Sequence, residues 1–189
     1  MIETKTQTLG TIDVSDKLIV TDPCYIPDCL DHGGLTEQLD VRPGKYEASI
    51  QTTDDTGGWG NRVASLRVER IGSRKCYRQH AGRLAVDSGQ MMFLSADKIG
   101  EWKADNFALM GDPITEAANV KYLRELTYNG ACLATLTSQG GILADAAAVS
   151  STGYGDGMYD LSVDYDDDGL IVAAEVTFIE EWDEDEDDE

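Results

Sequence analysis

The chain has 189 residues, of which 41% are hydrophobic and 27% charged, and its formal net charge is −21. This length and composition predict one folded domain with a real core, and they exclude a small domain that depends on disulfides. Residues 1–100 carry 12 Lys and Arg against 14 Asp and Glu, whereas residues 101–189 carry 3 against 22. The negative electrostatic field of so acidic a chain repels nucleic acid, so we expect no direct nucleic-acid binding. The charge instead favours a basic partner, or serves only to keep the protein soluble.

The first half of the chain predicts short strands separated by turns. Residues 8–14 and 17–21 read as two strands joined by a Ser-Asp turn. A long loop opens at Asp22 and lasts to about Asp40, with prolines that fix its backbone. Further strands are expected at residues 45–52, 63–69, 84–88 and 90–95, and a short helix capped by Ser95 or Asp97 is expected to reach Lys103.

The region after residue 111 contains the clearest helix signal. Asp112 and Pro113 resemble a helix start, and the apolar residues that follow, up to Thr127, recur at helical spacing. Asn129 and Gly130 are expected to end this helix. Residues 131–137 and 141–149 then read as two strands around a Ser-Gln-Gly-Gly turn.

The last predicted element is an antiparallel hairpin. Apolar and polar residues alternate from Tyr159 to Tyr165 and again over 172–178, which is the period of a half-buried strand. Residues 166–169 (Asp-Asp-Asp-Gly) supply the turn. The same region fits a calcium-loop pattern, which makes Asp164, Asp166 and Asp168 candidate ligands for Ca²⁺ or Mg²⁺, although a calcium loop also needs a helix on each side.

These elements together predict a mainly β (α+β) protein. We expect an antiparallel β-sandwich or open barrel with one or two helical insertions and a C-terminal hairpin. Residues 1–179 would form a single domain, and residues 180–189 an acidic tail without fixed structure. The chain has no apolar run of membrane-spanning length and a polar N-terminus, so no membrane association and a cytoplasmic location are expected, with reduced cysteines.

Three fragments carry a resemblance to a known family. They are Asp22-Pro23-Cys24-Tyr25, residues 85–90 (AVDSGQ), and residues 151–159 with their Gly-Asp-Gly-x-Tyr motif. Together with the hairpin they resemble a family of small, uncharacterised bacterial and phage proteins classed as a domain of unknown function. The resemblance spans most of residues 8–179 and implies a compact, β-rich, phage-associated protein. It implies no activity.

The candidate catalytic residues lie at strand ends and in glycine-rich bends. If Asp22, Cys24, Asp87, Ser88 and Asp156 meet, their carboxylates could hold a divalent cation or act as acid and base, with Cys24 as nucleophile. The alternative is ordinary turn chemistry. An Asp before a proline or between two glycines commonly accepts hydrogen bonds from nearby backbone amides, and this interpretation is favoured.

The candidate ligand-binding residues are of a different chemical type. Seven Lys and Arg lie between residues 62 and 83 against one Glu, and this region could hold an anion or could simply neutralise nearby acids. We take Tyr25, Arg62, Arg67, Ser88 and Tyr154 as the candidates for a small ligand. The two tyrosines are expected to be core or rim residues rather than a nucleic-acid stacking platform.

Zinc is a weaker alternative than Ca²⁺ or Mg²⁺. Cys24, Cys29 and His32 are spaced C-x4-C-x2-H, and Cys76 with His80 gives C-x3-H. Neither set has the regular spacing of a structural zinc site, and no cofactor is assigned.

The sequence supports three functions. The first is a non-enzymatic, phage-derived binding protein that engages a basic protein or a small anionic, nucleotide-like ligand. The second is a small metal-assisted hydrolase that uses Asp22, Asp87 and Asp156. The third is a structural or assembly accessory, for which a homo-oligomer would be the expected state.

Overall fold

The protein is a two-sheet antiparallel sandwich with one main helix. The computed structural model describes residues 3–26, 35–54, 56–104 and 122–180. Within these ranges the strands are β1 (Lys5–Val14), β2 (Lys17–Thr21), β3 (Glu37–Asp40), β4 (Gly44–Thr53), β5 (Arg62–Arg70), β6 (Tyr77–Val86), β7 (Gln90–Ser95), β8 (Gly140–Leu143), β9 (Ala147–Ser151), β10 (Gly157–Tyr165) and β11 (Ile171–Thr177). The helix α1 spans Tyr128–Ser138, and the 3₁₀ turns η1 and η3 span Pro23–Tyr25 and Ala96–Glu101.

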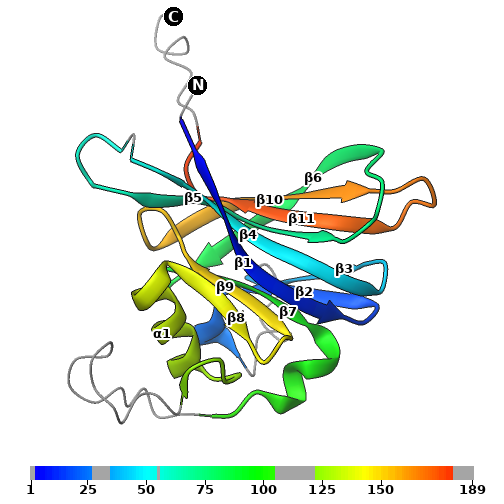
Figure 1. The fold of residues 1–189 in the computed structure, drawn as a ribbon, viewed down its shortest axis with the longest axis horizontal. Coiled ribbons are helices and arrows are strands. Elements are labelled where there is room, and N and C mark those ends of the chain that lie inside the picture. Colours follow the sequence, from blue (N-terminus) through cyan, green and yellow to red (C-terminus); the bar gives the residue numbers. More distant parts are fainter. Residues whose placement is uncertain (1–2, 27–34, 55, 105–121, 181–189) are drawn as a thin grey trace, which may run out of the picture.

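The strands are distributed over two sheets that lie face to face (Figure 1). The six-stranded sheet has the order β1-β4-β5-β11-β10-β6, and the five-stranded sheet has the order β3-β2-β7-β9-β8. Consecutive strands β1 and β2 belong to different sheets, since β1 pairs with β4 whereas β2 pairs with β3 and β7. The chain therefore crosses between the layers at the turn that follows Val14.

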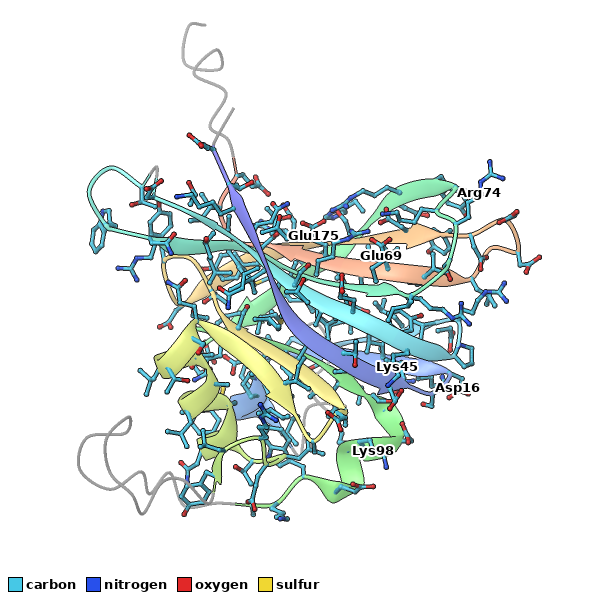
Figure 2. The ribbon with its side chains drawn as sticks, in the orientation of Figure 1. Asp16, Lys45, Glu69, Arg74, Lys98 and Glu175 are labelled. Atoms are coloured by element: carbon cyan, nitrogen blue, oxygen red, sulfur yellow. The ribbon has the colours of Figure 1, made fainter. Side chains whose placement is uncertain are left out.

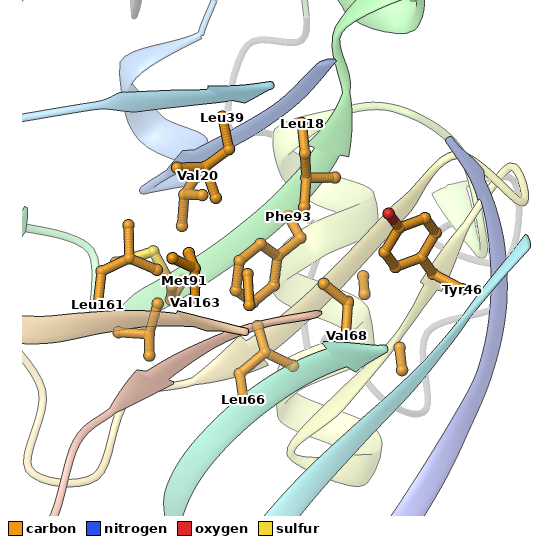
Figure 3. Close-up of a cluster of buried hydrophobic side chains, with 14 of the residues drawn as sticks. Leu18, Val20, Leu39, Tyr46, Leu66, Val68, Met91, Phe93, Leu161 and Val163 are labelled. Atoms are coloured by element: carbon orange, nitrogen blue, oxygen red, sulfur yellow. The ribbon is translucent and has the colours of Figure 1, made fainter. Parts of the chain in front are cut away.

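The main core fills the space between the two sheets. Figure 3 shows Phe93 at its centre, with Leu18 and Val20 from one sheet facing Leu66 and Leu161 from the other. Each of these side chains is fully buried. The alternation of β10 and β11 explains this arrangement, because the apolar row of each strand points inward and the polar row faces solvent.

A second, smaller core lies on the other face of the five-stranded sheet. Helix α1 and the segment around η1 cover this face, where Met92, Leu94 and Val149 pack with Ala131. Strand β7 is consequently buried on both faces, and all six of its residues are buried. This accounts for its run of apolar residues without alternation.

The helix is the main point at which the sequence prediction was wrong. Residues 131–137 form most of α1 rather than a strand, and Gly130 lies in the first turn rather than after the end of a helix. Thr127 caps the helix, because its Oγ1 accepts a hydrogen bond from Gly130 N at 2.9 Å. A Cβ at Gly130 would lie 2.3 Å from Glu125 O, so this position admits only glycine. The helix start predicted at residues 112–113 lies outside the described residues.

The segment 141–149 is also more divided than predicted. It contains the end of β8, a turn, and the start of β9. Ala144 and Asp145 adopt positive φ angles of 48° and 52°, and Ala146 N donates to Leu143 O at 3.0 Å. The turn contains no glycine or proline, and Asp145 is its one residue of a type common in turns, so its signal in the sequence is weak.

The predicted fold class is confirmed. The two sheets are antiparallel, they form no closed barrel within the described ranges, and α1 is the helical insertion. The predicted hairpin is present as β10 and β11, whose register pairs Leu161 with Val176 and Val163 with Ala174. None of the helices in the described part of the chain has the length and apolar character needed to cross a membrane.

Candidate functional site

Asp22 is the centre of a polar cluster that unites two of the motif fragments. Its side chain is fully buried, and each carboxylate oxygen accepts two hydrogen bonds. Oδ1 accepts from Cys24 N at 2.8 Å and from Ser88 Oγ at 2.6 Å, while Oδ2 accepts from Asp87 N at 2.9 Å and Ser88 N at 2.7 Å. Asp22 thereby fastens the turn between β6 and β7 to η1. Its acceptor positions are used by the protein itself.

Cys24 lies in the same cluster and is chemically quiet. Burial, the negative charge of Asp22 and a hydrogen bond to Asp22 raise the pKa of the Cys24 thiol to about 12. The thiol is therefore protonated at neutral pH, and a protonated thiol is a poor nucleophile. Burial and a hydrogen bond with Asp87 likewise raise the pKa of Tyr25 above its ordinary value.

Two residues of α1 extend this cluster, and the sequence analysis missed them. Burial is the largest cause of the raised pKa of Tyr128. Its interaction with Cys132 raises the pKa further, whereas its hydrogen bond with Ser88 lowers it. Gln90 Nε2 donates to Cys132 Sγ at 3.4 Å, while Gln90 Oε1 is buried without a protein partner. Gln90 follows the β6–β7 turn, whereas Tyr128 and Cys132 lie in the first half of α1. Recognising the Thr127 cap would have placed them correctly.

Asp156 does not join the Asp22 carboxylate. It is exposed in the loop between β9 and β10, beside Gly155, whose Cα lies 3.6 Å from a Cβ built on Gly89. The loop therefore approaches the β6–β7 turn through glycine backbone. Asp22, Cys24, Asp87 and Ser88 converge, whereas Asp156 forms no hydrogen bond or ion pair with these four residues.

Arg67 lies in a charged network on the outer face of the six-stranded sheet. Figure 2 shows Glu69 and Glu175 on this face. Arg67 contacts Glu69, Asp164 and Glu175 across β5, β11 and β10, and its own side chain is only 19% exposed. Arg78 adds a second ion pair to Glu175 at 2.7 Å. These basic side chains are thus neutralised by acidic neighbours, which was the simpler of the two interpretations.

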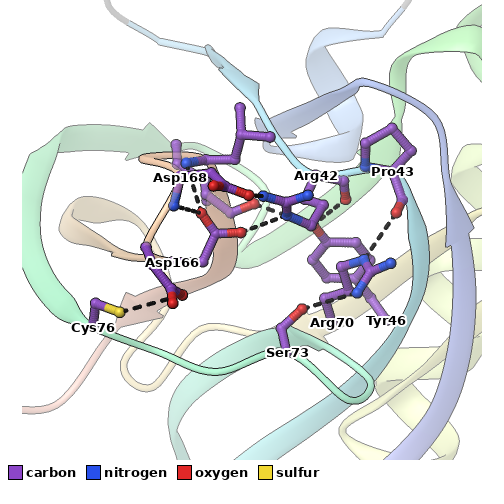
Figure 4. A network of polar contacts seen from close by, with 11 residues as sticks. Arg42, Pro43, Tyr46, Arg70, Ser73, Cys76, Asp166 and Asp168 are labelled. Atoms are coloured by element: carbon purple, nitrogen blue, oxygen red, sulfur yellow. Dashed lines mark hydrogen bonds and ion pairs between the residues drawn. The ribbon is translucent and has the colours of Figure 1, made fainter.

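In the acidic turn after β10, an arginine side chain pairs with the carboxylates that were predicted to bind a metal ion. Arg42 pairs with both Asp166 and Asp168 (Figure 4). Asp166 Oδ1 also accepts hydrogen bonds from the backbone N–H groups of Asp168 and Leu170, each at 3.0 Å. Because Asp164 pairs with Arg67, the three candidate metal ligands all have cationic partners.

No other grouping in the described residues has the composition of a metal centre. No set of three or more His, Cys, Asp or Glu lies close enough to hold a metal ion in that part of the chain. Cys29 and His32 fall outside the described residues. Cys76 is exposed, and its thiol contacts Asp167 at 3.6 Å.

A different pair of ligand candidates does come together. Arg62 and Tyr154 line a pocket of about 260 Å³ with Trp59, which we call the Trp59 pocket. Trp59 and Tyr154 are 68% and 54% exposed, and their rings meet edge to face with centroids 6.5 Å apart. Arg62 Nε donates to Trp59 O at 3.1 Å, and this arginine forms no ion pair with any described residue. The guanidinium therefore lies beside two exposed rings and is not neutralised by an acidic residue in the described part of the chain.

The loops that form the Trp59 pocket are held by internal hydrogen bonds. Thr56 is buried, and its Oγ1 donates to Gly60 O at 2.8 Å, which closes the loop between β4 and β5. In the loop between β9 and β10, Thr152 Oγ1 donates to Gly155 O at 2.7 Å. Gly153 N donates to Val63 O at 3.1 Å, and this bond joins the β9–β10 loop to the start of β5, directly after the β4–β5 loop. Exposed aromatic residues on such fastened loops are typical of a binding surface.

Gln139 attaches the same pocket to α1. It is the C-cap of the helix, with a left-handed φ of 59°. Its side-chain Nε2 donates to Asn61 O at 3.0 Å, and its backbone oxygen accepts from Ser151 N at 2.9 Å. One residue thus contacts the β4–β5 loop, the end of β9 and the helix.

Comparison of this chain with protein-family models, with curated proteins and with solved structures found no match. The resemblance to the bacterial and phage family stays a prediction.

Proposed function

We propose that the protein is a binding protein for a small anionic ligand that carries a planar ring, of the mononucleotide type, and that the Trp59 pocket is its site. The observation that carries the proposal is the position of Arg62 beside Trp59 and Tyr154, with no ion pair to any acidic residue that the structure describes. Exposed aromatic faces stack planar rings, and arginine binds phosphate through paired N–H donors. A mononucleotide presents both groups on one small molecule.

The size and charge of the surroundings favour a small ligand over a nucleic acid. A pocket of about 260 Å³ accommodates one ring and its substituent rather than a chain of nucleotides. The net charge of −21 repels a polyanion, whereas a single phosphate group meets mainly its local arginine.

The other functions have less support in the contacts. A hydrolase that uses Asp22 would need a free carboxylate, but both oxygens of Asp22 accept two hydrogen bonds each. The protonated Cys24 thiol offers no activated nucleophile. Binding to a basic partner and a role as an assembly accessory stay predictions.

Isothermal titration calorimetry of the full chain with GMP tests the proposal. Stacking on an aromatic side chain is worth about 1–3 kcal/mol, so Trp59→Ala should weaken binding by roughly 5- to 150-fold. Arg62→Ala should weaken it by a similar factor, and Arg62→Lys should recover only part of the loss, because lysine lacks the paired donors.

Two variants at the far end of the sheet serve as controls. Arg74→Ala removes an exposed arginine from the loop after β5, and Tyr77→Ala removes a 53% exposed ring from the start of β6 (Figure 2 labels Arg74). Because Arg62 begins β5 and Arg74 follows its end, these changes lie away from the Trp59 pocket. Equal losses in control and pocket variants, or no measurable binding of GMP, would refute the proposal.

A further inference from the structure

A second pocket adjoins the Trp59 pocket on the other side of Tyr154. It has a volume of about 270 Å³, and we call it the Asp160 pocket. Its lining residues come from β6, the β9–β10 loop, β10 and the end of β11: Arg83, Tyr154, Met158, Tyr159, Asp160, Thr177, Phe178, Ile179 and Glu180. Tyr154 is the lining residue that the two pockets share, so a ligand in the Trp59 pocket lies next to the Asp160 pocket.

The walls of the Asp160 pocket are apolar and partly open to solvent. Met158 is 47% exposed, and the buried Phe178 meets Tyr159 edge to face with ring centroids 5.1 Å apart. Gly153 packs so closely against this wall that a Cβ would lie 3.0 Å from Ile179 Cγ1. The position of the loop that carries Tyr154 is therefore determined by the wall of the second pocket.

Two carboxyl groups provide the polar part of this pocket. Asp160 and Glu180 both line it, and carboxylate oxygens accept hydrogen bonds from N–H donors. Arg83 pairs with Asp160, with 3.2 Å between Nε and Oδ1, and its Nη2 donates to Met158 O at 3.1 Å. Among the described residues Glu180 has no such ion pair, so Glu180 is the carboxyl group that can take a new donor.

We propose that the Asp160 pocket reads the base of the ligand, and that it selects bases with an exocyclic amine. This inference rests on the proposed function, because it assumes a nucleotide with its phosphate at Arg62 and its base against Tyr154. The N–H donors of such a base would donate hydrogen bonds to the carboxylate of Glu180 in this pocket. Carboxylates accept hydrogen bonds from base amines, and a well-placed pair discriminates by about 1–3 kcal/mol.

Matched nucleotides separate this chemistry from stacking. GMP and IMP differ by the amine on C2, and CMP offers an amine where UMP offers a carbonyl oxygen. Both members of each pair present a similar ring and the same phosphate. We expect GMP to bind about 5- to 150-fold more tightly than IMP, and CMP more tightly than UMP.

The preference should also depend on pH. The hydrogen bond to Asp160, burial and the charge of Asp160 raise the pKa of Glu180, and the charge of Arg83 opposes them. Tyr154 and Tyr159 also face the pocket, and burial raises the pKa of Tyr159 further above neutrality. Ionised Glu180 accepts the amine, so the ratio of GMP to IMP affinity should rise with pH as Glu180 loses its proton. Titration of the phosphate affects both nucleotides alike.

The experiment measures all four nucleotides against the full chain and two variants by calorimetry from pH 5 to 8. Glu180→Ala should bring the GMP to IMP ratio close to one, with IMP affinity changed less than twofold. Glu180→Gln should remove the pH dependence of the ratio. Wild-type protein that binds GMP and IMP equally, or a Glu180→Ala variant that retains the preference, would overturn the inference.

The failure of this inference differs from the failure of the proposed function. If all four nucleotides bind equally and their binding still depends on Trp59 and Arg62, the base-reading role alone is refuted. If none of them binds, both proposals are refuted.

Discussion

The buried carboxylate of Asp22 offers the sharpest test of how the fold is held together. In Asp22→Asn, one of the two oxygens becomes an NH₂ group of nearly the same size. Oδ1 and Oδ2 each accept two hydrogen bonds. With the NH₂ group at the Oδ2 position, two backbone N–H groups lose their acceptor; at the Oδ1 position Ser88 Oγ can reverse and accept from the NH₂ group, so only the bond from Cys24 N is lost.

The expected loss follows from these contacts. A hydrogen bond to a charged group contributes about 1.5–3 kcal/mol and a neutral one about 0.5–1.5 kcal/mol; one bond is lost and the other three become neutral, so Asp22→Asn should lower the free energy of unfolding by about 3–6 kcal/mol. A domain of this kind has about 5–15 kcal/mol in total, so much of the stability would be lost. With a urea m-value of about 2 kcal/mol/M, the midpoint should fall by about 1.5–3 M.

Urea unfolding followed by tryptophan fluorescence and circular dichroism measures this effect. The matched control is Asp40→Asn, because Asp40 is 82% exposed and its contact with Lys17 is a surface ion pair at 3.2 Å. That change should cost less than about 1 kcal/mol. If Asp22→Asn falls within 1 kcal/mol of the wild type, the four hydrogen bonds do not hold the β6–β7 turn, and Asp22 is free for another role.

Three further outcomes are expected. Cys24 should resist iodoacetamide at pH 8 while the exposed Cys76 reacts, as read by mass spectrometry; rapid labelling of both would contradict the raised pKa of Cys24. Arg67→Met leaves the largely buried carboxylate of Asp164 without its cation, and should lower the free energy of unfolding by roughly 3 kcal/mol in urea; a neutral result would count against the network. A hydrogen bond from Arg42 lowers the pKa of Asp166, so this pair stabilises the protein above the ordinary Asp pKa and the contribution disappears as pH falls through the lowered value. Arg42→Gln should therefore lose less stability than the wild type between pH 6 and 3, and equal losses would refute the pairing.

Strand periodicity made most of the fold predictable. The alternation of residues 159–165 and 172–178 placed the right side chains in the core, because one face of each strand is buried. Helix α1 was missed because Asn129 and Gly130 usually follow a helix, whereas here the approach of the Glu125 carbonyl requires glycine in the first turn. The signal that decided the matter was the Thr127 cap.

The candidate site was predictable in chemistry but not in geometry. The sequence grouped Asp22 with Asp87 and Ser88 correctly, since all three follow strands that pair or neighbour one another in the fold. It grouped Arg62 with Tyr154 as ligand candidates but did not add Trp59, because these residues meet only when the β9–β10 loop is joined to the start of β5 by the bond from Gly153 N to Val63 O. Nothing in local spacing indicates that bond.

Gln139 has a mechanical consequence for the Trp59 pocket. Gln139 ends α1, and it is hydrogen-bonded to the β4–β5 loop through its side chain and to the end of β9 through its backbone carbonyl. A shift of any one of these three elements would therefore strain the hydrogen bonds to the other two. A ligand that orders the β4–β5 loop, which carries Trp59, would therefore also reduce fraying at the C-terminal end of α1. Amide exchange at residues 136–139 would then register occupancy of a pocket those residues do not line.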